Sequence, residues 1–202
     1  WKLQIIAGVL LSALILPVFV SVHSIVSWDF GMAVAAKSWH STIFAPYFVV
    51  GAVHSGVSAV AFVLILLRWM YGWQDYIRHE HIDGLGRLLV VVATGWFYFF
   101  VMEVVFGIYG READEIAVRS LQFVQAPFQV WTIIFIVTTY FIPVTLWLTR
   151  RARRNLWIMS LACISVNIGM WLERFLIIVP GLANRTAFTF SWNHYVPTVY
   201  EA

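Results

Sequence analysis

Charged side chains are scarce in this chain. Asp, Glu, Lys and Arg together make up 11% of the 202 residues and hydrophobic residues make up 61%, whereas soluble domains are about 25% charged. Five runs are apolar enough to cross a bilayer, which takes about 20 residues. Lipid offers backbone groups no hydrogen-bond partner, so each run is expected to be a helix. The sequence predicts an all-α, polytopic transmembrane helix bundle forming a single membrane domain over residues 1–202, with spans at about 3–28, 43–68, 87–109, 126–149 and 156–179.

Cysteine is almost absent, because Cys163 in the last predicted span is the only one. A single cysteine excludes an internal disulfide, a Cys-ligated iron-sulfur cluster and covalently attached haem within the chain. A b-type haem needs two facing histidines, but His23 and His54 are expected to differ in depth by about 8 Å. We therefore predict no haem and no iron-sulfur cluster in this chain.

The run IRHEHIDGLGR, residues 77–87, invites a metal-site interpretation. The zinc-helix pattern places its two histidines four residues apart. His79 and His81 are only two residues apart, and would point away from each other on a helix. We therefore expect a solvated, charged loop here and no metal site.

Basic residues are unevenly divided between the two predicted membrane faces. Eight fall on one side and four on the other, and the positive-inside rule makes the richer side cytoplasmic. The Arg150–Arg154 loop is then cytoplasmic and the opposite face periplasmic. The cluster is too short for a nucleic-acid surface and is held at the bilayer, so no nucleic-acid partner is expected. The first side holds Lys2, Arg68, Arg78, Arg87, Arg150, Arg151, Arg153 and Arg154; the second holds Lys37, Arg111, Arg119 and Arg185.

Ionisable residues inside the spans gather in their outer halves, beneath the polar and aromatic join of residues 23–44. A charged residue at the centre of a spanning helix costs at least ~2.5 kcal/mol, so such residues usually face a pocket or a pathway. We predict an outer-side cavity suited to a flat, apolar molecule that gains or loses protons, as a quinol does. The alternatives are that Glu173 and Arg174 form a structural ion pair, that His54 is a packing residue, and that the aromatic residues are an interfacial belt. The residues concerned are His23, His54, Glu103, Glu173 and Arg174, with Trp28, Trp39, Tyr47 and Trp171 as walls.

Four segments resemble the NrfD/PsrC family of membrane quinone subunits. They are VHSIVSWDFGMAVAAKSWHSTIFAPYFVVGAVHSG, HIDGLGRLLVVVATGWFYFFVMEVVFGIYG, NIGMWLERFLIIVP and SWNHYVPT. They follow in the family's order over nearly the whole chain, and they are most similar to the ActC and ActF proteins of alternative complex III. The resemblance implies a bundle of eight to ten helices. Because the chain lacks an initiator Met and Pro197 stands where a further helix would begin, we expect additional helices on both sides.

The resemblance also implies site roles. Asp29 matches the carboxylate that accepts a quinol proton, with His23 and Glu103 as further catalytic candidates. Quinol binding is expected to involve Asp29, Trp39, His40, Tyr47 and Arg174, and the proton path Glu103 and Glu173. His54 departs from the family pattern, in which this position is usually apolar.

By the same resemblance, the substrate would be a quinol such as menaquinol. Its electrons would pass to an iron-sulfur subunit at the periplasmic face of a respiratory or photosynthetic complex in a bacterial inner membrane. Other expected partners are a second NrfD-like membrane subunit, c-type cytochrome subunits and lipid, and proton translocation is an expected further activity. The open alternatives are a non-catalytic structural paralogue or anchor in the same complex, and a proton- or ion-coupled transporter. The direction of electron flow is left open.

Overall fold

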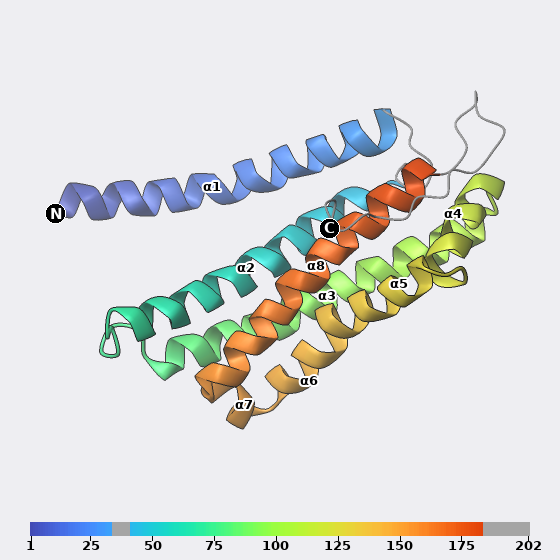
Figure 1. Ribbon diagram of the computed structural model, residues 1–202. Helices are drawn as coiled ribbons and strands as arrows, with labels where there is room; N and C mark the ends of the chain where they lie inside the picture. The colour runs from blue at the N-terminus through green and yellow to red at the C-terminus, as the bar shows by residue number, and fades with distance from the viewer. Residues whose placement is uncertain (34–40, 184–202) are drawn as a thin grey trace.

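Helices make up all the regular structure of residues 1–33 and 41–183, which the computed structural model describes (Figure 1). Five of the helical segments in these ranges are long and apolar enough to cross a membrane. The predicted all-α, polytopic bundle is therefore confirmed. The elements are α1 (Lys2–Trp28), the π-helical turn η1 (Asp29–Ala33), α2 (Phe44–Met70), α3 (His79–Gly110), α4 (Ala113–Phe123), α5 (Phe128–Ile136), the π-helical segment η2 (Val137–Phe141), α6 (Ile142–Leu148), α7 (Arg150–Arg154) and α8 (Leu156–Ala183).

The core lies between α2, α3, α8 and the continuous α5–η2–α6 rod, whereas α1 runs along the outside of this group (Figure 1). Apolar side chains cover most of α1, and Ser27 is its only buried residue. An apolar helix that the described elements leave uncovered is stable only in lipid or against another protein surface. The best-buried core side chains include Leu89, Ala93, Trp96, Phe135, Met159 and Val166.

The two ends of the bundle differ in character. Residues 71–78 and α7 lie at one end, and α4 lies at the other with the start of α2 and the end of α8 (Figure 1). The arginine-rich helix α7 is therefore far from α4. For the basic residues that the structure describes, the predicted division between the two faces corresponds to these two ends, whereas Lys37 and Arg185 lie outside the described residues.

The solvated loop predicted for residues 77–87 is wrong for most of its length, because α3 begins at His79. Arg78 caps the helix, and its backbone N–H donates to His81 Nδ1 at 3.2 Å. Asp83 is buried and accepts from Arg87 Nε at 3.1 Å and from Arg153 Nε at 2.8 Å. These hydrogen bonds compensate the charge of Asp83 in the first turns of α3, which extend beyond the apolar core.

The run READEIAVR, residues 111–119, lies between the third and fourth predicted spans, where no helix was predicted, but Ala113–Phe123 forms α4. Asp114 and Glu115 lie in its first turn, where negative charge complements the helix dipole. The buried face of α4 carries Glu115, Val118 and Gln122. A short, two-faced helix therefore caps this end of the bundle.

Pro143 lies in α6, within the fourth predicted span, and the five-residue π-helical segment η2 directly precedes this helix. Proline has no N–H to donate to the carbonyl four residues earlier. The N–H of Ile142 bonds to Val137 O, five residues back. Two carbonyls of η2 therefore accept side-chain donors from other helices: Ser165 Oγ donates to Thr138 O at 2.8 Å, and His54 Nε2 lies 3.4 Å from Thr139 O.

Candidate functional site

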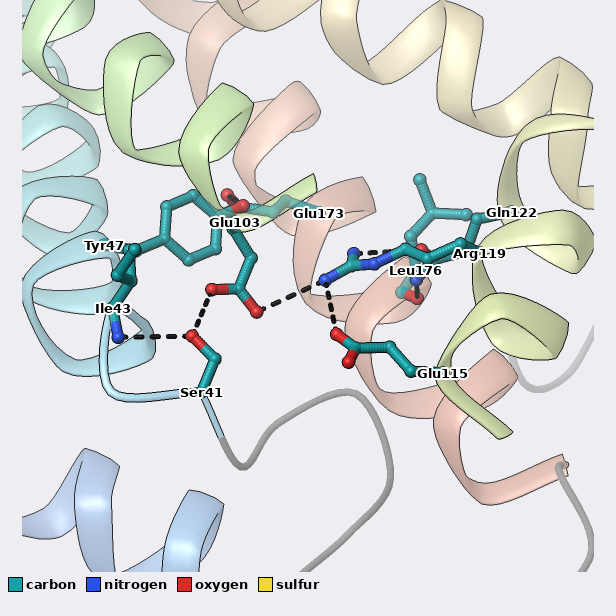
Figure 2. A network of polar contacts seen from close by, with 9 residues as sticks. All are labelled: Ser41, Ile43, Tyr47, Glu103, Glu115, Arg119, Gln122, Glu173 and Leu176. Carbon is teal, nitrogen blue, oxygen red and sulfur yellow. Dashed lines mark hydrogen bonds and ion pairs between the residues drawn. The ribbon is translucent and has the colours of Figure 1, made fainter. Parts of the chain in front are cut away.

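Glu103 of α3 is the centre of a buried polar network at the α4 end of the bundle (Figure 2). Its carboxylate accepts from Ser41 Oγ at 2.6 Å and from Arg119 Nη2 at 3.2 Å. Arg119 Nη2 also lies 3.8 Å from Glu115 Oε1, and Arg119 Nη1 donates to Gln122 Oε1 at 3.2 Å. One guanidinium therefore serves two carboxylates, and the network joins α3, α4 and the start of α2.

Glu173 of α8 is a second buried carboxylate close to this network (Figure 2). Its Oε1 accepts from the Tyr47 hydroxyl and from Trp96 Nε1, the latter at 2.9 Å. Its Oε2 lies 3.4 Å from Arg174 Nη2. The Arg174 guanidinium also stacks on the Phe48 ring, with Cζ 4.3 Å from the ring centroid. The ion pair considered from the sequence is present, and Glu173 additionally binds α2 and α3.

The two carboxylates line one small cavity of about 40 Å³. A single bound water needs at least ~10–15 Å³ of such space, whereas small-molecule pockets usually measure ~300–1,000 Å³. The cavity therefore suits water molecules and proton exchange, and it is far too small for a quinol ring. Its polar lining comprises Tyr47, Glu103, Arg119, Gln122, Thr132 and Glu173, and its apolar lining Phe44, Phe100, Phe123, Phe135, Leu176 and Ile177.

The predicted residues of α1 and its continuation lie apart from this cavity. His23 is half-buried, and its Nδ1 lies 2.9 Å from Phe19 O within the same helix. Asp29 is exposed at the start of η1. Trp28 Nε1 donates to Thr42 O at 3.4 Å, so the end of α1 contacts the segment that also carries Ser41.

The predicted aromatic walls are only partly brought together. Tyr47 lines the cavity, whereas Trp28 and Trp171 are exposed, and Trp171 stacks on Phe175 with ring centroids 6.1 Å apart. Trp39 and His40 lie outside the described residues. Of the predicted ionisable residues, Glu103 and Glu173 share the cavity and Arg174 lies beside it.

Sequence reasoning missed five members of the network, which are Ser41, Trp96, Glu115, Arg119 and Gln122. Arg119 was counted only toward membrane orientation, because no helix was predicted between the third and fourth spans. Glu115, Val118, Arg119 and Gln122 recur at i, i+3, i+4 and i+7, which is the pattern of one helix face. That pattern would have placed the arginine on the same face as the buried residues.

Chemically, the arrangement can hold and transfer protons. Two carboxylates on different helices face a space that accommodates water, and a tyrosine hydroxyl and a serine hydroxyl donate to them. Ionisable groups at membrane depth typically mark such pathways when they face a bundle interior.

Comparison with known proteins gives one family. The family model described as "Polysulphide reductase, NrfD" matches residues 2–184, which include all five candidate spans and both buried carboxylates. No curated protein matches the chain significantly.

Proposed function

The chain belongs to the polysulphide reductase NrfD family, and from this membership we propose that it is the quinol-oxidising membrane subunit of an electron-transfer complex. Family members are integral membrane subunits that interact with quinone in oxidoreductase complexes and partner with iron-sulfur subunits. Oxidation of one quinol to quinone releases two protons and two electrons. The proton acceptors belong to this chain, and the electrons pass to the iron-sulfur partner.

The observation that carries this proposal is the pair of buried carboxylates, Glu103 and Glu173, around one small cavity. They share this cavity with Arg119 of α4, and α4 lies at the end of the bundle opposite the arginine-rich α7 (Figure 1). A reaction that releases protons near a membrane face needs acceptors there, and buried carboxylates with positioned donors are suitable general bases. Glu103 and Glu173 would carry quinol protons toward the periplasm or contribute to proton translocation.

The small cavity volume restricts where the quinol ring can bind. We propose that the ring binds at the lipid-facing end of α1, where Asp29 is exposed and accepts the first proton. His23 lies six residues earlier, about 9 Å along α1 at ~1.5 Å per residue, and would be a second proton acceptor on this helix, and Trp39 and His40 would complete the contacts with the ring. Tyr47 and Arg174 would contribute from inside the bundle, because both side chains contact the Glu173 carboxylate.

The finer assignment is an alternative complex III-like quinol:acceptor oxidoreductase, with this chain corresponding to ActC or ActF. Menaquinol is the proposed substrate. The proposed partners are an iron-sulfur protein at the periplasmic face, a second NrfD-like subunit and c-type cytochrome subunits, in a bacterial inner membrane with Arg150–Arg154 cytoplasmic. The apolar surface of α1 that the described helices leave uncovered is evidence for contact between α1 and a membrane-embedded partner or lipid.

The test is Asp29→Asn in the intact complex, assayed for quinol turnover at equal assembly. Loss of a general base typically lowers a rate by about 10²–10⁴-fold, and we expect a fall in this range. Asp75→Asn is the matched control, because Asp75 is also exposed but lies in the segment at the opposite end of the bundle. Unchanged turnover in Asp29→Asn would favour a structural anchor or a non-catalytic paralogue.

A second candidate function is proton- or ion-coupled transport. The buried ion pair between Glu103 and Arg119 favours it, because charge pairs at membrane depth also occur in transport pathways. Liposomes containing this protein without partners distinguish the two functions. Transport in such liposomes would support the transporter, whereas the proposed oxidoreductase subunit needs its iron-sulfur partner for activity.

A further inference from the structure

A polar stripe of α2 continues inward from the outer network. Tyr47, Gly51, His54 and Ser58 are all buried, and their three- and four-residue spacing places them on one helix face. At ~1.5 Å per residue, the stripe is about 16 Å long, roughly half the ~30 Å thickness of the hydrocarbon layer. Its inner end therefore reaches the middle of the membrane.

His54 lies fully buried near the inner end of this stripe. Its Nε2 is 3.4 Å from Thr139 O, the carbonyl that Pro143 leaves without its usual donor. With Nε2–H donating to that carbonyl, a neutral ring has Nδ1 as an acceptor nitrogen. Trp96 stacks on the imidazole at 6.1 Å between ring centroids, and Trp147 meets it edge-on at 6.2 Å.

Three polar atoms at this place are buried without a hydrogen-bond partner among the described residues. They are His54 Nδ1, Thr139 Oγ1 and Trp147 Nε1. A buried polar atom that stays unpaired is destabilising, and all three belong to His54 or to residues that contact it. A buried water typically has two to four polar partners. A water bonded to all three would donate to Nδ1, accept from the Trp147 indole N–H and bond to the Thr139 hydroxyl.

We propose that His54, Thr139 and Trp147 bind an internal water, and that this water exchanges with the outer end of the bundle past Gly51. Gly51 lies between Tyr47 and His54 on the stripe, and the side chains of Arg174, Met170 and Trp96 pack against it, so water passes there only when these side chains move. A Cβ at this glycine would lie 3.1 Å from Arg174 Nη2, 3.2 Å from Met170 Cε and 3.3 Å from Trp96 Cδ1. Water passing here would meet Arg174 Nη1 and Glu173 Oε2, which are also buried without a hydrogen-bond partner among the described residues.

Apolar side chains block the route for water between His54 and the α7 end of the bundle. Beyond Ser58, the next buried residues of α2 are Ala61 and Ile65, which belong to the same hydrophobic core as Leu89 and Met159. Water therefore reaches His54 from the outer end. A neutral imidazole bonded to exchangeable water can accept and return a proton, so His54 extends the proton-holding groups of the outer network to mid-membrane. This last step rests on the proposed function, whereas the hydration does not.

The test uses the full-length protein in its complex, in lipid nanodiscs. A high-resolution density map is expected to show a water peak within hydrogen-bond distance of His54 Nδ1 and Trp147 Nε1. In ¹⁵N-tryptophan-labelled protein, the Trp147 indole signal is identified by its loss in Trp147→Phe, and its exchange is followed after transfer to D₂O. We expect Gly51→Ala to slow this exchange by roughly tenfold, because the added methyl group tightens the packing that must open.

Gly56→Ala is the matched control, because Gly56 lies in the same helix with nothing within 4 Å of an added Cβ. Its indole exchange should equal that of the wild type, and the melting temperature of each variant verifies the fold. A map with no water at His54 would overturn the binding site. Equal exchange in Gly51→Ala and Gly56→Ala would overturn access past Gly51. Neither measurement involves quinol, so failure here is distinct from failure of the Asp29→Asn turnover test.

Discussion

Arg119 is the residue on which the buried charge of Glu103 depends. Its guanidinium lies 3.2 Å from the Glu103 carboxylate, and both side chains are nearly inaccessible, with 12% and 4% exposure. Removal of one partner from a buried ion pair leaves an uncompensated charge and typically costs about 3–5 kcal/mol. We expect Arg119→Met to lower the free energy of unfolding by this amount, measured by thermal or denaturant unfolding in detergent.

The matched comparison is the double variant Arg119→Met with Glu103→Gln. A neutral amide needs no counter-ion, so the second change should recover a large part of the lost stability. If Arg119→Met alone is as stable as the wild type, Glu103 is not held as a charged group by this arginine.

Individual residues of the candidate site were predictable only where they stood out from an apolar background. Glu103 and Glu173 are conspicuous because charged residues within spanning helices are costly. Ser41 and Trp96 are ordinary members of a membrane protein, and only three-dimensional proximity makes them partners of the two carboxylates. The role of Asp29 still rests on resemblance and stays a prediction.

At the scale of elements, charged and glycine-containing sequence was mistaken for loop. The start of α3 is helical because a tertiary contact outweighs local composition: Asp83 bonds to Arg153 of α7. Gly86 permits this approach, since a Cβ there would lie only 2.7 Å from Arg153 Cδ. No pattern within residues 77–87 contains that information, because the partner lies about 70 positions later in the chain.

The contact between α8 and η2 also depends on a glycine. A Cβ at Gly169 would overlap Thr139 Oγ1 and lie 3.0 Å from the Thr139 backbone nitrogen, which cannot rotate away. Overpacking of this kind typically costs 1–3 kcal/mol, so we expect Gly169→Ala to lower the free energy of unfolding by about 1–3 kcal/mol. Unfolding followed by circular dichroism gives the difference.

Gly8→Ala provides the reference for that substitution, since Gly8 also lies in a helix but nothing is within 4 Å of an added Cβ. Alanine there should be neutral or stabilise the helix by up to about 1 kcal/mol. Equal effects at the two positions would show that α8 and η2 do not pack as tightly as described.

At the scale of the molecule, hydropathy and backbone hydrogen bonding were sufficient to predict five spanning helices, because a bilayer permits few other structures. The π-helical segment and α4 were not predictable in the same way. The first follows from Pro143 together with donors on α2 and α8, and the second from burial of one face against neighbouring helices. The resulting molecule has the Glu103 and Glu173 carboxylates around a cavity near α4, and an arginine-rich helix, α7, at the other end.

This polarity leads to a prediction about orientation in the membrane. Cytoplasmic ends of membrane proteins are enriched in Lys and Arg, so the end with α7 and residues 71–78 should face the cytoplasm. The two ends can be labelled separately in a Cys163→Ala background, which removes the one native thiol. In spheroplasts, an impermeant maleimide should modify Ala113→Cys at the start of α4, whereas Gln74→Cys should react only after lysis; both positions are exposed. The reverse labelling would put Glu103 and Glu173 near the cytoplasm, and quinol protons could not then be released through them to the periplasm.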